Sequence, residues 1–315
     1  MKSPNILIVG TGAIGSFYGG SLARAGANVC TLVRSDYEYV KTNGISIKSV
    51  MGDFIFKPHE VVQKVEDYSK TPDYIIVSTK VLPDINIEKI IKPKVGKNTA
   101  IVLIQNGIDI EQPISEAFPQ NEMISCLAFI GVSKIAPGQI YHQDHGRIVI
   151  GNYPKGKTKK VEILKELFNT SRIPCMVDEN IITSRWKKLV WNAPFNPISV
   201  IGGNITTDII LKNTESLNFV IRIMKEVISL ANAFGYPLSE DLIHQNISDT
   251  MSMAPYKPSM LLDFENKRPL EVEAILGNTV RLARKISFQV PNLEAIYAML
   301  LLLDEGNRTY KRNST

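Results

Sequence analysis

The stretch Gly10–Gly15, which reads GTGAIG, constrains the fold more than any other part of the sequence. It follows the apolar run 5–9 (NILIV) and opens a segment of helical length that closes at Gly26. Between a strand and a helix, the first glycine allows a tight turn, the second lets the backbone approach a pyrophosphate, and the third permits close packing. The helix N-terminus then stabilises the phosphate charge. The residues of this predicted dinucleotide-binding turn are Gly10, Thr11, Gly12, Ala13, Ile14 and Gly15.

Short, β-branched apolar runs continue through the first half of the chain. They lie at 5–9, 28–33, 74–79 and 100–104, as strands buried on both faces of a parallel sheet would. The segment 45–57 reads as two strands around Gly52. Further strands are predicted over 124–150 with turns at PGQ and HGR, and a last one ends near Val177. The pattern predicts an α/β fold, a Rossmann-type doubly wound sheet with an antiparallel extension.

After about residue 178 the pattern changes to long helical periodicity with almost no strand signal. We therefore predict two domains, an NADP-binding Rossmann-like domain over residues 1–178 and an all-helical substrate and catalytic domain over 179–315. The predicted helices span 180–201, 212–234, 239–250, 259–265, 270–287 and 291–303.

Composition narrows the functional classes. A net charge of +5 with scattered basic residues gives no reason to expect nucleic acid as a partner. No apolar stretch approaches the length of a membrane span, and the N-terminus runs directly into a strand, so we expect a cytoplasmic protein without a membrane partner. The three cysteines lie singly in apolar runs and are expected to be small buried thiols. The four histidines show no metal-binding spacing, and no metal is predicted. The long apolar helices would suit either a homodimer or a packed monomer.

Polar residues at three strand ends indicate where a cofactor would bind. Arg34 follows the second strand, and a guanidinium suits the 2′-phosphate of NADP. Asp36, two residues later, is expected to cap the next helix or to face water, although it could also allow use of NADH. Lys80 and Asn106 follow later strands and are predicted cofactor contacts, because ligands of open parallel sheets lie beyond the carboxyl ends of the strands.

A polar ladder interrupts the apolar stretch WKKLVWNAPFNP at 186–197. Lys188, Asn192 and Asn196 are spaced four residues apart and so lie along one side of a helix. Pro194 should bend this helix, and Pro197 should end it or bend it again. The ladder is either a polar seam between helices or part of a site.

The later stretch 256–278 adds two more polar candidates. Ser259 could cap a helix or donate to a substrate carboxylate. Glu271 shares a helical side with Asn278, and a partly buried carboxylate there needs a cation, for which Lys188 is the candidate; Glu273 is expected to face water. His142 and His145 are a weak alternative as catalytic groups.

Several motifs carry a family resemblance: in chain order, the glycine turn, Arg34, Lys80, Asn106, the polar ladder at 186–197 and the stretch 256–278. Together they resemble the motifs of the ketopantoate reductase (2-dehydropantoate 2-reductase) family across nearly the whole chain. The resemblance implies that Lys188 is the proton donor to the substrate carbonyl, and that Asn192, Asn196 and Ser259 bind substrate. It also implies that Lys80, Asn106 and Glu271 contact the cofactor or order the site, with Glu271 counted as catalytic and Asn106 also as a substrate contact. The implied activity is NADPH-dependent reduction of the 2-oxo acid 2-dehydropantoate to pantoate, a step of pantothenate and coenzyme A biosynthesis.

Two alternatives remain at this stage. The chain departs from the family at Tyr256, Leu262 and Leu270, which leaves room for a related NADP-dependent reductase of another 2-oxo acid. A regulator that senses NADPH without turnover is the other alternative.

Overall fold

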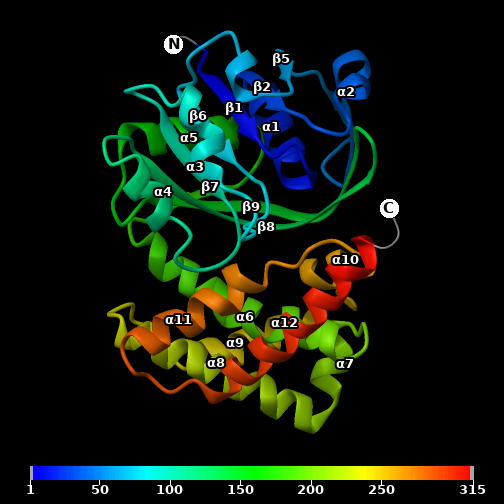
Figure 1. Ribbon diagram of the computed structural model, residues 1–315, viewed down its shortest axis with the longest axis vertical. Coiled ribbons are helices and arrows are strands. Elements are labelled where there is room, and N and C mark those ends of the chain that lie inside the picture. The colour runs from blue at the N-terminus through cyan, green and yellow to red at the C-terminus, as the bar shows by residue number, and fades with distance from the viewer. Residues whose placement is uncertain (1–2, 313–315) are drawn as a thin grey trace. The chain divides into compact units, whose positions relative to one another are not determined.

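The computed structural model describes residues 3–312, and these residues belong to two compact units (Figure 1). The sheet unit comprises Met1–Lys80, Ile85–Gln105 and Glu111–Ile182. The helical unit comprises Thr183–Thr315 together with two short segments from earlier in the chain, Val81–Asp84 and Asn106–Ile110. No sequence feature indicated that these two segments join the helices, and the predicted division at residue 178 stays a prediction.

The sheet unit is built on a mixed sheet that has ten strands within the described residues. Its main path runs β4-β3-β9-β8-β7-β6-β1-β2-β5, and β10 pairs with β9. The strands are β1 (Asn5–Val9), β2 (Asn28–Leu32), β3 (Ile45–Ser49), β4 (Phe54–Phe56), β5 (Glu60–Val62), β6 (Tyr74–Val77), β7 (Ala100–Ile104), β8 (Met123–Ala136), β9 (Gln139–Asn152) and β10 (Cys175–Val177).

Parallel pairing from β5 through β2, β1, β6 and β7 to β8 confirms the predicted doubly wound core. The antiparallel extension is present as the β8–β9 and β3–β4 pairs. Helices of this unit are α1 (Ala13–Arg24), α2 (Tyr37–Asn43), α3 (Ile87–Ile91), α4 (Gln112–Ala117) and α5 (Lys159–Thr170), with short 3-10 turns at η1 (Val65–Asp67) and η2 (Lys92–Lys94).

Both faces of the parallel sheet are covered by helices. Successive residues of β1 point to opposite faces, so each face contributes to a different core. Ile6 and Ile8 pack into a core with residues of α1 and α5. Leu7 and Val9 pack into a second core with residues of α3 and α4. This arrangement explains why the strand is a continuous apolar run in the sequence.

The helical unit consists of α6 (Ile181–Ile201), α7 (Thr207–Lys212), α8 (Thr214–Ala233), α9 (Asp241–Ser252), α10 (Ser259–Glu265), the π-helical turn η3 (Glu273–Gly277), α11 (Asn278–Lys285) and α12 (Pro291–Arg312). Its all-helical character confirms the prediction. In the described part of the chain no helix combines the length and the apolar character that a membrane span requires.

Helix α6 continues to Ile201, close to the predicted bounds, so Pro197 does not end it, and a second bend at Pro197 stays a prediction. Two local predictions were wrong. The run 270–287 is not one regular helix, because its first turn is π-helical. The HGR motif is not a turn: His145 and Gly146 lie inside β9, where both have positive φ and the pairing passes over Gly146. Two residues then oppose one on the partner strand, which is a β-bulge.

Candidate active site

The glycine turn of the sheet unit has the geometry of a nucleotide-binding turn. Gly10 has φ +102°, and a Cβ there would lie 2.5 Å from the backbone nitrogen of Thr79. A Cβ on Gly15 would lie 2.3 Å from the carbonyl oxygen of Gly10. Gly12, in contrast, is exposed and has nothing within 4 Å of such a Cβ. Packing therefore requires the first and third glycines, while the second leaves the backbone open to a ligand.

Side chains on either side hold this turn in place. The hydroxyl of Thr11 donates to the carbonyl of Leu32 at the end of β2, with a distance of 2.7 Å. The hydroxyl of Ser78, just beyond β6, donates to the carbonyl of Gly10 at 2.8 Å. Helix α1 begins at Ala13, directly after the glycine turn. The N–H groups at the start of a helix have no partner within the helix, so those of Ala13 and Ile14 can donate to an anion.

Arg34 and Asp36 differ sharply in their surroundings. Arg34 is exposed beyond the end of β2. Asp36 is buried, and its carboxylate accepts from Ser35 Oγ at 2.8 Å and from the Gly138 N–H at 3.0 Å, and pairs with Lys134. Asp36 occupies the N-cap position of α2, as expected, but its side chain makes no capping hydrogen bond, and the expectation that it faces water was wrong. Burial raises the pKa of Asp36, but these three contacts outweigh it and hold the pKa below its usual value.

The ends of β6 and β7 are joined to each other within the sheet unit. The amide of Gln105 donates to the Thr79 carbonyl at 2.7 Å. Lys80 follows Thr79 and is partly exposed. Directly after these residues the chain passes into the helical unit, at Val81 and at Asn106. The residues that follow two central strands are thus held by the helices.

Lys188 of α6 reaches the second of these segments. Its amine donates to Oδ1 of Asn106 at 2.9 Å. Asn106 stands two positions beyond the last residue of β7, so this hydrogen bond puts an amine beside the chain where it leaves the sheet. The predicted pairing of Lys188 with Glu271 stays a prediction.

The segment Asn106–Ile110 is fixed along its backbone by the helical unit. Arg185 donates from Nη1 to the Gly107 carbonyl at 3.0 Å. The Ile108 N–H donates to the Ala274 carbonyl at 3.0 Å, and the Ile108 carbonyl accepts from Asn278 Nδ2 at 2.7 Å. The approach is close enough that Gly107, at φ +106°, has no room for a Cβ, which would lie 2.4 Å from the Ala274 oxygen.

Glu271 holds the other early segment. Its Oε1 accepts from the backbone N–H of Val81 at 3.0 Å, and the residue is half-buried. The carboxylate therefore fixes the start of the segment that follows Lys80.

The asparagine ladder divides into two kinds of residue. Asn196 is 1% exposed, and its Oδ1 accepts from the Met260 N–H at 3.2 Å and, more weakly, from Ser259 Oγ at 3.5 Å. Its Nδ2 donates to the Asn192 carbonyl at 3.2 Å. Asn196 therefore serves the first turn of α10, the capping task considered for Ser259, while Ser259 itself is exposed. Asn192 is buried.

Two residues that anchor the Asn106–Ile110 segment were not predicted as site residues. Arg185 precedes Lys188 by three positions and so lies near it on α6. The sequence pattern put Asn278 on the same helical side as Glu271, although in the structure Glu271 precedes the π-helical turn. Both spacings were visible in the sequence, but their partner segment was not. Glu273, expected to face water, is partly buried and bonds to Arg281 at 2.5 Å and to the Tyr297 hydroxyl at 2.8 Å.

The histidine pair belongs to the sheet, not to a catalytic group. His142 is fully buried; its Nδ1 accepts from Ser49 Oγ at 2.8 Å, and its Nε2 faces the carbonyls of Asp144 and His145 at 3.1 and 3.2 Å. Because carbonyl oxygens only accept, these two contacts assign a proton to Nε2. Burial lowers the pKa of His142 even though both carbonyls oppose this shift.

Comparison with known proteins agrees with this geometry. Residues 6–155 match the family model described as ketopantoate reductase PanE/ApbA, and residues 180–304 match the model of its C-terminal part. A relative from Nostoc sp., named 2-dehydropantoate 2-reductase, is 34% identical over 98% of this chain and 98% of its own length.

Solved structures extend the comparison. The 2-dehydropantoate 2-reductase from Methylococcus capsulatus is 46% identical, with a TM-score of 0.92 over 96% of this chain and 98% of that one. The corresponding structure from Geobacter metallireducens is 31% identical, with a TM-score of 0.89 over 96% and 99% of the two chains. This chain is therefore an oxidoreductase that belongs to the ketopantoate reductase family.

Proposed function

We propose that this protein reduces 2-dehydropantoate to pantoate with NADPH, as a step of pantothenate and coenzyme A biosynthesis in the cytoplasm. The names of the relatives from Nostoc sp. and Methylococcus capsulatus support the substrate. The single observation that carries the proposal is the hydrogen bond from Lys188 to Asn106, because it holds an amine beside the end of a central strand.

The sheet unit would hold the cofactor. Its open Gly12 backbone and the N-terminus of α1 fit a pyrophosphate, and the exposed guanidinium of Arg34 fits the 2′-phosphate that distinguishes NADPH from NADH. Lys80, Asn106 and Glu271 are proposed as further cofactor contacts. When bound, the reduced nicotinamide supplies a hydride to the ketone carbon of the substrate.

Lys188 would act on the ketone oxygen. As that oxygen gains negative charge, an ammonium within hydrogen-bond distance stabilises it and then delivers a proton. Asn106 would orient the ammonium, because its amide oxygen accepts one of the N–H groups of Lys188 and so fixes the direction of the amine.

The remaining polar residues would hold the substrate and order the site. We propose that Asn192 and Ser259 bind its hydroxyl and carboxylate ends, so that the carbonyl is presented to Lys188 in one orientation. Asn196 would contribute to this binding mainly by fixing Ser259. Glu271 would keep the segment after Lys80 in position. Its negative charge would also favour the protonated form of Lys188.

Steady-state kinetics with a matched pair of lysine variants test the proposal. Lys188→Ala should lower kcat with 2-dehydropantoate by about 100-fold or more while the Kd for NADPH stays nearly unchanged. Lys187→Ala is the control, because Lys187 is its exposed neighbour on α6 and should keep the wild-type kcat. A Lys188→Ala enzyme that retains most of its kcat would remove this lysine from the mechanism.

Substrate choice needs a separate measurement. NADPH oxidation is followed with 2-dehydropantoate beside several smaller 2-oxo acids, and 2-dehydropantoate should give the highest kcat/KM. A higher value for another 2-oxo acid would reassign the substrate. Tight NADPH binding without turnover of any of them would favour a regulator.

A further inference from the structure

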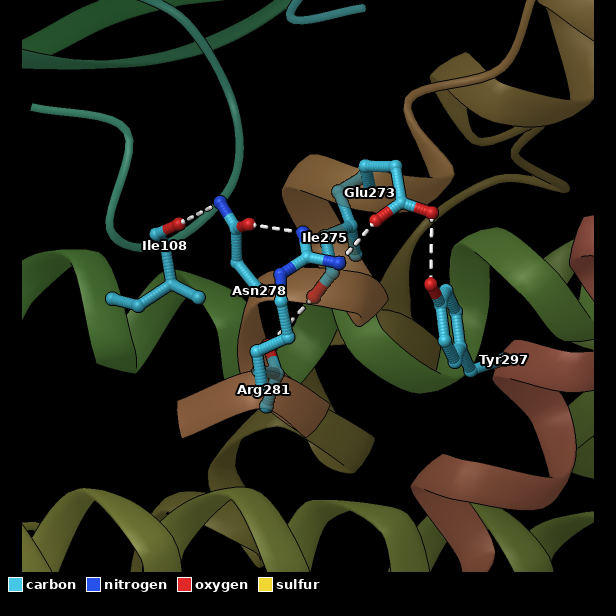
Figure 2. A network of polar contacts seen from close by, with 7 residues as sticks. Ile108, Glu273, Ile275, Asn278, Arg281 and Tyr297 are labelled. Atoms are coloured by element: carbon cyan, nitrogen blue, oxygen red, sulfur yellow. Dashed lines mark hydrogen bonds and ion pairs between the residues drawn. The ribbon is translucent and has the colours of Figure 1, made fainter. Parts of the chain in front are cut away.

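A network of polar side chains in the helical unit ends on the segment that carries Asn106 (Figure 2). Its last contact is the hydrogen bond of 2.7 Å from Asn278 Nδ2 to the Ile108 carbonyl, which joins two residues 170 positions apart in the sequence. Because Gly107 and Ile108 are held by Arg185, Ala274 and Asn278, little backbone freedom is left for the adjacent Asn106.

The amide of Asn278 can bind in only one orientation. Arg281 donates from Nη2 to Oδ1 of Asn278 at 2.5 Å, and a guanidinium has no acceptor, so the NH₂ group of Asn278 must face Ile108. Arg281 is held in turn by Glu273 at 2.5 Å, and Glu273 accepts from the Tyr297 hydroxyl at 2.8 Å. The chain of contacts in Figure 2 thus runs from α12 through η3 and α11 to Ile108.

Stability alone is a poor explanation for this network. The Arg281 side chain is 54% exposed, and ion pairs at that exposure contribute little to the free energy of unfolding. The orientation of an amide that reaches a buried carbonyl, in contrast, is a specific geometric effect. The π-helical turn η3 is part of this network, because it carries Glu273 and also Ala274, whose carbonyl accepts from the Ile108 N–H. Such π-helical turns often occur at functional sites.

We propose that Asn278, oriented by Arg281, Glu273 and Tyr297, is a positioning residue that keeps Asn106 in register with Lys188. The inference rests on the proposed function, in which the Lys188 ammonium is the proton donor. Asn278 touches neither substrate nor cofactor in this role. Its effect passes through two backbone residues to the Asn106 side chain, where a displacement of about 1 Å can reduce the rate by about 100-fold.

The test uses Asn278→Ala and Arg281→Ala in the full-length protein. Arg284→Ala is the matched control: Arg284 lies on the same helix, α11, is 63% exposed and forms its ion pair with Glu294 at 2.9 Å, away from the segment. Two readouts are taken for each variant. One is amide hydrogen exchange of residues 106–110, which needs no substrate, and the other is the pH profile of kcat with 2-dehydropantoate and NADPH.

Asn278→Ala should speed amide exchange in 106–110 and lower kcat by about tenfold or more, with KM for NADPH changed by less than about threefold. The pH at which kcat falls should also move, because Lys188 has lost a fixed partner. Arg281→Ala should show the same changes to a smaller degree, and Arg284→Ala neither.

Faster exchange with an unchanged kcat and pH profile would overturn the inference, and so would a lower kcat with unchanged exchange. A wild-type enzyme that turns over no 2-oxo acid would instead refute the proposed function. In that case the exchange rates alone would still decide whether Asn278 anchors the segment.

Discussion

Lys188 and Asn106 lie 82 residues apart in the chain, yet the amine of one donates to the side-chain oxygen of the other at 2.9 Å. One stands on α6 and the other follows β7. The bond joins a helix to a segment from much earlier in the chain, and both belong to the helical unit.

Asn106→Ala should therefore lower kcat by about tenfold to 100-fold, because the ammonium of Lys188 loses the acceptor that orients it. The Kd for NADPH, measured by fluorescence titration, should rise less than kcat falls. A loss confined to NADPH binding, with kcat intact, would mean that Asn106 serves the cofactor alone.

The alanine variants of Asn192 and Asn196 should differ in which property they change, stability or substrate binding. Asn196→Ala removes the acceptor of the Met260 N–H and leaves a small void in a fully buried site, so it should cost about 1–3 kcal/mol of unfolding free energy in urea titrations. Asn192→Ala should cost less stability and mainly raise KM for 2-dehydropantoate. Equal stability losses without any change of KM would remove Asn192 from substrate binding.

Cofactor choice should depend on Lys134 as well as on Arg34. Arg34→Ala should raise KM for NADPH and leave that for NADH nearly unchanged. Lys134→Met removes the cation that pairs with Asp36, and the carboxylate two residues from Arg34 should then weaken NADPH binding relative to NADH by about tenfold. Adding Asp36→Asn to Lys134→Met should restore the preference. If the double variant binds NADPH as weakly as Lys134→Met does, the carboxylate is not the cause.

The buried His142 should make the protein less stable in mild acid. Burial lowers its pKa in the folded state from 6.5, so below about pH 6.5 the unfolded chain binds a proton that the folded chain resists. The contribution of His142 to the free energy of unfolding should accordingly be constant well above that pH and fall as the pH drops below it.

Urea titrations at several pH values measure this slope. His142→Gln should be less stable at neutral pH, because it disturbs a buried site, but its stability should fall less steeply with acid. His244→Gln, at an exposed position, should keep the wild-type slope. The same slope in all three proteins would assign the acid effect to other groups.

Local signals predicted much of the fold. The glycine turn and the buried strands around it were readable because each depends on short-range spacing, and the helical second half was readable from its periodicity. Gly12 and Gly15 even divide the tasks of approach and packing as the motif implies. Features that failed depend on distant partners: Asp36 has its cation on β8, and the bulge at His145 follows from pairing with that same strand.

The site was predictable as a set of residue types but not as an arrangement. Lys188 and Asn106 were both identified, yet nothing in the sequence indicated that they bond to each other. Arg185 and Asn278 were passed over because their partners are backbone carbonyls of a segment far away in the chain. A carbonyl carries no residue-specific signal, so such contacts are invisible without the fold.

The membership of Asn106–Ile110 in the helical unit has a consequence for how the protein is made. During translation this segment leaves the ribosome long before Lys188, and well before Ala274 and Asn278 exist. Its backbone groups must remain hydrated until the C-terminal helices arrive to replace the water. Assembly of the reactive centre is therefore among the final events of biosynthesis, and a nascent chain stalled before residue 274 should carry a formed sheet with an inert edge.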